Sequence, residues 1–131
     1  MRFLQIIPAV FAASTLAAKF ENFVDTSCQR YSADYKLITV AEQEKLIVDS
    51  WAKTPTSQET SRAFSPKGSC PSNADDTYKW ITVPQWNDVP TRFGRPGGGS
   101  IAVVYFNETD TYHVCRYLAS VQPNGYAGFC K

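Results

Sequence analysis

Histidine and closely spaced cysteine pairs are both scarce in this 131-residue sequence. It contains one histidine, His113, and four cysteines, none of them in a CxxC motif. Structural zinc sites combine cysteine pairs at such spacings with histidines, so the sequence predicts no metal site. The proline–glycine run at residues 96–99 lacks the Lys-Ser/Thr pair of a phosphate-binding loop and favours a turn. We therefore expect neither a metal nor a bound cofactor.

Long apolar runs are absent apart from one at the N-terminus. Residues 3–16 are mostly apolar and follow one basic residue, but the run is too short to span a bilayer. Thr15 and Ala17 place small side chains at the −3 and −1 positions of a signal-peptidase site. The sequence predicts a signal peptide over residues 1–17, cleaved after Ala17 or, less favourably, after Ala18. The alternative is a buried N-terminal helix.

An excess of charge of either sign is also missing. The chain has 13 Lys and Arg residues against 12 Asp and Glu residues, and removal of Arg2 with the signal peptide would make it formally neutral. A general nucleic-acid binder carries an overall basic field, which this chain lacks. This excludes a binder of overall basic charge but leaves room for a local basic patch.

The remaining residues 18–131 have the size of one compact domain and contain no further apolar run to anchor it in a membrane. The signal peptide predicts a secreted protein, and four cysteines in an exported chain predict two disulfides. Four cysteines allow three pairings, of which we favour Cys28–Cys130 and Cys70–Cys115. The first pair would join the two ends of the domain, and the second would fasten its middle to the last hairpin.

The helix and strand signals predict an α+β domain. Thr39 and Glu42 form a capping box in front of residues with helical spacing, which predicts a helix over residues 40–52. A strand or hairpin is expected at residues 30–38, and strands at 62–64, 78–83, 100–106, 111–119 and up to Cys130. The two longest strands flank a four-residue turn at 107–110. This order predicts one helix packed on a twisted antiparallel β-sheet.

The second half of the sequence carries a succession of motifs known from one family. Tyr78-Lys79-Trp80 precedes a long loop, the turn Pro96-Gly97-Gly98, the strand Val103-Val104-Tyr105-Phe106-Asn107, and Asn124-Gly125-Tyr126 before the last cysteine. This succession resembles the small fungal guanyl-specific ribonucleases of the T1 type. The preceding helix and a disulfide from near the N-terminus to the last cysteine also fit. The resemblance implies a T1-like microbial ribonuclease fold.

The resemblance also places unsuitable residues where that family has its catalytic groups. RNA cleavage there needs a glutamate as base, an arginine beside the phosphate and a histidine as acid. The base position falls on Lys79, the arginine position on Ala102 or Val103, and the acid position near Ala119 or Ser120. A protonated lysine cannot accept the 2′-hydroxyl proton, and neither alanine nor serine is a general acid at neutral pH. The resemblance therefore implies a ribonuclease fold without catalytic residues, and not an enzyme.

The ribonuclease-like secreted effectors of powdery mildew fungi match this description. Many of them have an aromatic residue two positions before the first cysteine, where this chain has Thr26. Resemblance to this group implies a virulence function after secretion, with translocation into the host cell. It also implies binding to host RNA, to ribosomal components or to a host protein, and detection by a host immune receptor. We expect the protein to be a monomer.

A basic and aromatic loop supplies the candidate RNA-binding residues. Arg92, Phe93 and Arg95 lie in the long loop, and Lys79 and Trp86 are near them in the sequence. Single-stranded RNA is commonly bound by stacking on aromatic rings together with cationic contacts to phosphate. We expect these five residues to line the rim of the former active-site groove. The alternative is a surface loop that tolerates aromatic residues.

Two other functions fit the sequence. An active secreted guanyl-type ribonuclease with a non-standard site would use Asp75, Asp76 and His113, although adjacent acids in a loop usually form a solvated turn. A structural or antimicrobial cell-surface protein is the third hypothesis. Separately, Asn107 begins an Asn-Glu-Thr glycosylation sequon on the predicted hairpin turn, where it would be accessible during secretion.

Overall fold

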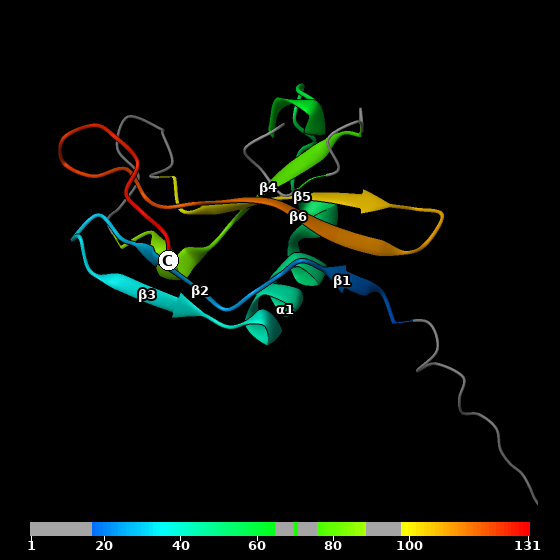
Figure 1. Ribbon diagram of the computed structural model, residues 1–131, viewed down its shortest axis with the longest axis horizontal. Helices are drawn as coiled ribbons and strands as arrows, with labels where there is room; N and C mark the ends of the chain where they lie inside the picture. Colours follow the sequence, from blue (N-terminus) through cyan, green and yellow to red (C-terminus); the bar gives the residue numbers. More distant parts are fainter. Residues whose placement is uncertain (1–16, 65–69, 71–75, 89–97) are drawn as a thin grey trace, which may run out of the picture.

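A mixed four-stranded β-sheet is the centre of this computed structural model, which describes residues 17–64, 70, 76–88 and 98–131 (Figure 1). In sheet order its strands are β1 (Lys19–Glu21), β6 (Thr111–Leu118), β5 (Ser100–Phe106) and β4 (Tyr78–Thr82). Strands β4, β5 and β6 are antiparallel neighbours, whereas β1 runs parallel to β6. The expectation of a purely antiparallel sheet is therefore wrong at the β1 edge.

The hairpin of β5 and β6 forms where the sequence predicts it. Its strands flank the turn at 107–110, and the Tyr105 hydroxyl donates a hydrogen bond to Asp110 at 2.6 Å across that turn. A register shift between Ala102 and Val103 leaves Cys115 as an extra residue in β6. This bulge places Cys115 on the side of the sheet where Cys70 lies, and the two form a disulfide.

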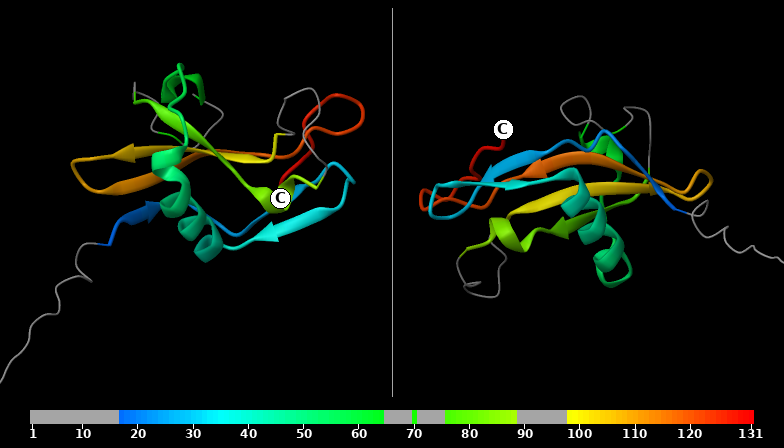
Figure 2. Two further views of the ribbon diagram at one scale, coloured as in Figure 1. Left: turned by 180° about the vertical axis from the view of Figure 1, so that it is seen from behind. Right: turned by 90° about the horizontal axis from the view of Figure 1, so that it is seen from below.

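The helix α1 (Val40–Ser50) covers one face of the sheet (Figure 2). It begins as predicted, because the Thr39 side chain accepts a hydrogen bond from the Glu42 backbone N–H while the Glu42 carboxylate accepts one from the Thr39 backbone N–H. The 3₁₀ turn η3 (Trp51–Lys53) follows it directly. The main core contains the buried side chains of Cys28, Ile38, Ile47, Ile81, Val83, Trp86, Ile101, Val103, Val114 and Ala119.

The opposite face of the sheet is covered by the segment that follows the helix (Figure 1). This segment contains the 3₁₀ turn η4 (Ser61–Phe64), and the Phe64 ring centroid lies 4.7 Å from that of Tyr78 and 5.8 Å from that of Trp80. The strand expected at 62–64 is therefore wrong. Phe64 packs its ring onto the sheet from a tight turn and does not join the sheet as a strand.

A second, two-stranded sheet lies at one end of the molecule. It pairs β2 (Thr26–Gln29) with β3 (Tyr35–Ile38) in antiparallel register, so the strand or hairpin expected at 30–38 is confirmed while its partner β2 is additional. The C-terminal residues pair with the other side of β2, where Ser27 and Lys131 exchange backbone hydrogen bonds of 2.9 and 2.7 Å. The C-terminal segment thus pairs with β2, near the start of the domain.

Both favoured disulfides are confirmed. Cys28 is bonded to Cys130 at a sequence separation of 102, and Cys70 to Cys115 at a separation of 45. Over the described residues, the structure is thus α+β, with one α-helix on a mixed sheet and two disulfides. Of the predicted signal peptide, residues 1–16 lie outside the described residues. Across the ranges that are described, no helix is long and apolar enough to cross a membrane.

Charged side chains hold the turn between β2 and β3 in place. The Arg30 guanidinium lies 2.6 Å from the Asp34 carboxylate, and Asp88 accepts a hydrogen bond of 2.8 Å from the Tyr31 backbone N–H. A hydrogen bond from Arg30, which has the larger effect, and one from the Ser32 hydroxyl lower the pKa of Asp34 from 3.8 to about 2. Asp34 is therefore ionised throughout the ordinary pH range.

The ion pair of Arg30 and Asp34 predicts that stability depends on pH in the acid range. Because the folded-state pKa of Asp34 is lowered, its contribution is complete above its unfolded value near 3.8 and is lost as the pH falls toward about 2. Asp34→Asn should therefore be less stable than the unmodified protein above pH 4, and the difference should vanish toward pH 2. Urea unfolding of both proteins across this window measures it. A difference that is independent of pH would contradict the assignment.

Candidate functional site

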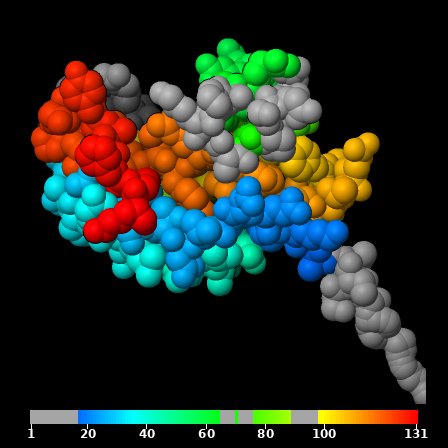
Figure 3. All heavy atoms as spheres, in the orientation of Figure 1, coloured from blue at the N-terminus to red at the C-terminus, as the bar shows by residue number. Residues whose placement is uncertain are grey.

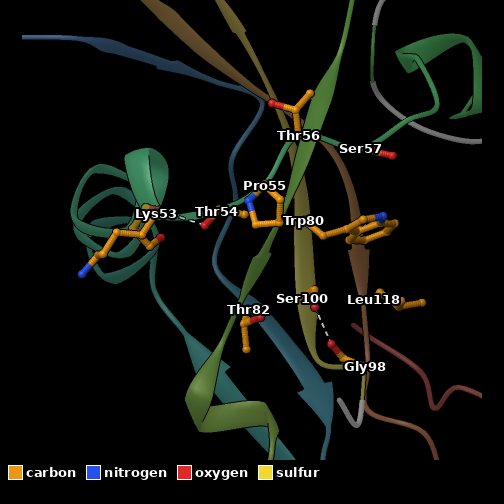
Figure 4. A pocket seen from close by; sticks show the side chains of 11 residues that line it. Lys53, Thr54, Pro55, Thr56, Ser57, Trp80, Thr82, Gly98, Ser100 and Leu118 are labelled. Atoms are coloured by element: carbon orange, nitrogen blue, oxygen red, sulfur yellow. Dashed lines mark hydrogen bonds between the residues drawn. The ribbon is translucent and has the colours of Figure 1, made fainter. Parts of the chain in front are cut away.

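A pocket of about 640 Å³ lies beside β4 (Figure 4). One wall comes from the end of the helix and the segment after it, and the other from the ends of β4, β5 and β6. The described lining residues are Ser50, Lys53, Thr54, Pro55, Thr56, Ser57, Trp80, Thr82, Gly98, Ser100 and Leu118. Hydroxyl side chains form the largest group among them, and Lys53 is the one charged residue in this set.

Hydrogen bonds to the backbone fix the wall that follows the helix. The Ser50 hydroxyl donates to the Leu46 carbonyl at 2.6 Å, and the Thr54 hydroxyl donates to the Ser50 carbonyl at 2.8 Å. Two residues beyond Pro55, the Ser57 N–H donates to the Tyr78 carbonyl on β4 at 2.8 Å. Thr56 and Thr82 are exposed, and their hydroxyls form no hydrogen bond with any other described residue. These two hydroxyls are available to a ligand.

Trp80 supplies the aromatic surface of the pocket. Its indole extends from β4 across β5 and β6 toward Leu118 (Figure 4). Edge-on contacts hold the ring, with centroids 5.8 Å from Phe64 and 6.0 Å from Tyr78. Gly98 lies at the pocket with φ +108°, and a Cβ there would come within 2.9 Å of the Ala119 carbonyl oxygen. Only glycine therefore fits at this point of the lining.

Lys79 lies on the opposite face of β4 from Trp80. Its ammonium donates to the Trp51 carbonyl oxygen at 2.7 Å and lies 4.6 Å from the centroid of the Trp51 ring. The side chain therefore contacts the end of the helix region and does not reach the pocket. The predicted place of Lys79 on an RNA-binding rim does not fit this geometry, because adjacent strand residues face opposite sides of a sheet.

Two tyrosines near Trp51 cannot serve as proton acceptors. The ring centroid of Trp51 lies 6.1 Å from Tyr105 and 5.2 Å from Tyr112. The hydrogen bond to Asp110 raises the pKa of Tyr105 to about 12, and burial raises the pKa of Tyr112. Both hydroxyls therefore stay protonated at neutral pH and provide no base on this side of the sheet.

Trp86 belongs to the core and not to a ligand-binding rim. It ends the 3₁₀ turn η5 (Pro84–Trp86), has no exposed surface, and donates its indole N–H to the Lys36 carbonyl oxygen at 2.8 Å. Its ring is therefore unable to stack on a base, contrary to its predicted role. Arg92, Phe93 and Arg95, the other three candidates, lie outside the described residues.

The positions that the resemblance assigns to the arginine and to the acid are buried. Ala102 and Val103 have no exposed surface, and Ala119 and Ser120 are each 1% exposed. His113 is also buried, with Nδ1 2.8 Å from the Val114 carbonyl oxygen and its ring 6.4 Å from that of Phe106. Asp76 forms neither a hydrogen bond nor an ion pair with His113, and Asp75 lies outside the described residues.

Comparison of the chain with known protein families, with curated proteins and with solved structures gave no match. Within the part of the chain that the structure describes, no group of three or more histidine, cysteine, aspartate or glutamate side chains could hold a metal ion.

No local sequence pattern predicts the pocket, because its two walls come from segments that are far apart along the chain. Residues 54–57 read as a Ser/Thr/Pro loop, and nothing local shows that Ser57 pairs with β4. Strand alternation was the one available signal, since it puts Trp80 and Thr82 on the same side of β4 and Lys79 on the other. Asn107 is exposed on the turn between β5 and β6, as the sequon requires, and its glycosylation stays a prediction.

Proposed function

We propose that this chain is an exported, non-enzymatic effector of T1-ribonuclease-like fold that binds single-stranded host RNA in the pocket beside β4. The observation that carries this proposal is the Trp80 indole in a pocket otherwise lined mainly by hydroxyl groups. An aromatic ring stacks on any base, and hydroxyls both donate to and accept from base edges. The two disulfides support export, because such bonds persist in oxidising compartments.

Cations for the RNA backbone lie beside this pocket. Lys53 is exposed at the edge of the lining, and its ammonium points away from Trp80 (Figure 4). Arg116 is exposed on β6, two residues before Leu118 and therefore on the same side of the strand. A base stacked on Trp80 would place its flanking phosphates near these side chains. Lys53 and Arg116 are the cations that we propose to contact these phosphates, on a chain with little net charge.

The described residues favour binding over cleavage. RNA hydrolysis of the ribonuclease type needs an acid and a base on either side of one phosphate. The lining of the pocket contains neither carboxylates nor histidine among its described members, and Lys79 is engaged by Trp51. This arrangement supports a pseudoenzyme, and an active ribonuclease built on His113 becomes an outcome of the test.

Replacing Trp80 should weaken RNA binding strongly. Stacking of one base on an aromatic ring contributes about 1 to 3 kcal/mol, so Trp80→Ala should lower the affinity roughly five- to hundredfold. Trp80→Phe should retain most of the affinity, because it keeps an aromatic ring. Fluorescence titration of labelled single-stranded RNA at low and moderate salt measures this, with circular dichroism to show that each variant is folded.

Charge variants test the proposed contacts with the RNA phosphates. Arg116→Gln should weaken binding and reduce its dependence on salt, whereas Lys45→Gln, on the exposed surface of α1, should change neither. Neutralising Arg92 and Arg95 tests the predicted loop separately. Equal RNA affinity for Trp80→Ala and the unmodified protein would exclude the pocket as the binding site. Guanosine-specific cleavage of total RNA, abolished by His113→Ala, would exclude a non-enzymatic function.

A further inference from the structure

The outer edge of β3 is open in the small sheet at the end of the molecule. The backbone groups of Ser27 and Gln29 bond to the C-terminal segment, with Ser27 N–H to Lys131 O and Gln29 N–H to Phe129 O both at 2.9 Å. Backbone groups alternate in direction along a strand, so Cys28 bonds to β3 while Tyr35 and Leu37 point their N–H and C=O groups outward. Among the described segments, only β2 pairs with β3.

Apolar side chains accompany this open edge. Tyr35 is 38% exposed and Leu37 is 51% exposed, and both lie on one face of β3. Phe129, 74% exposed, lies across β2 on the same face, and the Lys131 ammonium sits 4.1 Å from the centroid of the Tyr35 ring. Figure 3 shows the C-terminal residues and the β3 region side by side on the surface. An incoming strand would bury this apolar row.

Contacts within the protein hold this edge in place. The Cys28–Cys130 disulfide fixes β2, and the Trp86 indole N–H holds the Lys36 carbonyl oxygen from the core side. Asp88 bonds to the backbone of the turn between β2 and β3. A preformed edge loses little conformational entropy on binding, which favours the addition of another strand.

Charge distinguishes between the two kinds of strand that could be added. The charged side chains of this sheet and its turn are Arg30, Asp34, Lys36 and Lys131, and Arg30 is paired with Asp34. Lys36 is exposed and forms no ion pair with any described residue. A second copy that used the open groups of both Tyr35 and Leu37 would set Lys36 directly opposite Lys36, which is unfavourable. An acidic residue at that point is favourable.

We propose that the β3 edge, Tyr35–Ile38, is a docking site for an extended segment of a partner protein. The segment would add as an antiparallel strand, with an acidic residue opposite Lys36 and apolar residues opposite Tyr35 and Leu37. This site is separate from the pocket at Trp80 and does not depend on RNA binding. Main-chain hydrogen bonds would give the affinity, and the acidic residue with its two apolar neighbours would give the selectivity.

A designed peptide tests the site directly. The probe is a capped peptide, Ser-Thr-Val-Glu-Val-Thr-Ser, and the matched control replaces its glutamate by lysine. Addition of the probe to the disulfide-bonded protein should slow hydrogen exchange several-fold at the Tyr35 and Leu37 amides, as seen by NMR. A probe with both valines N-methylated should have no effect. In Lys36→Glu, the preference between the two peptides should reverse by roughly two- to fivefold.

The following results would contradict the proposal. Unchanged exchange at Tyr35 and Leu37, or changes centred on Trp80, would show that the edge does not accept a strand. Exchange at both amides that becomes slower as the concentration of the free protein is raised would show that a second copy occupies the edge. A peptide preference that Lys36→Glu leaves unaltered would exclude the proposed recognition of an acidic residue.

Discussion

Removing the Cys28–Cys130 disulfide should lower the free energy of unfolding by about 4 to 5 kcal/mol. The bond closes a loop at a sequence separation of 102, and the chain-entropy model gives about 4.7 kcal/mol for a loop of that size. It also holds the C-terminal segment against β2, where Ser27 and Lys131 exchange hydrogen bonds. Urea unfolding of the Cys28→Ala/Cys130→Ala variant, followed by circular dichroism, measures the loss.

The second disulfide provides the control for this experiment. Cys70–Cys115 closes a shorter loop, at a separation of 45, so the loop model assigns it a slightly smaller effect, by under about 1 kcal/mol. Removal of Cys28–Cys130 should additionally expose the Ser27 amide to hydrogen exchange, whereas removal of Cys70–Cys115 should not. A loss below about 1 kcal/mol for Cys28→Ala/Cys130→Ala would show that the pairing with β2 holds the C-terminal segment without the covalent bond.

Trp86→Ala should destabilise the protein by about 3 to 5 kcal/mol. Trp86 is the bulkiest fully buried side chain among the described residues and contributes to the main core between the sheet and β3. Truncation of a buried tryptophan leaves a cavity that the surrounding structure fills only in part. It also removes the indole N–H from the Lys36 carbonyl oxygen. Chemical denaturation monitored by far-ultraviolet circular dichroism avoids dependence on the fluorescence of the residue removed.

Trp86→Phe separates the two contributions. Phenylalanine keeps most of the ring volume but loses the donor, so the hydrogen bond to Lys36 alone should account for about 1 kcal/mol of the change. RNA binding should be unaffected in Trp86→Phe, because Trp86 does not reach the pocket. The role that the sequence predicted for Trp86 is tested by Trp86→Leu, which removes the aromatic ring: a loss of RNA affinity in folded Trp86→Leu equal to that of Trp80→Ala would restore that role.

Local signals in the sequence were sufficient for the helix and the hairpin. The capping box of Thr39 and Glu42 fixes the start of α1, and the turn at 107–110 separates two strands of alternating pattern. The disulfide pairing also followed, since only one arrangement joins both the chain ends and the middle to the last hairpin. These features depend on residues close in sequence or on simple closure of the chain.

The elements that were missed depend on partners far away in the sequence. β1 has three residues and lies beside β6, far along the chain, with the ring centroids of Phe20 and Tyr112 5.1 Å apart. Trp86 stands between polar residues and a basic loop, so its sequence context predicted exposure. It is buried in the main core, where its indole N–H donates to the Lys36 carbonyl on β3. Likewise, the pocket requires Ser57 to meet β4, which no local pattern indicates.

The order of the four cysteines has a consequence for biosynthesis. In a chain that emerges N-terminus first, Cys28 and Cys70 both appear before either of their native partners, Cys130 and Cys115. Before Cys115 emerges, an oxidant could join only these two cysteines, and that pair is non-native. Wherever that bond forms, native bonding needs thiolate attack on the early disulfide and its exchange. Disulfide isomerase activity should therefore raise the yield of the native protein above that obtained with an oxidant alone.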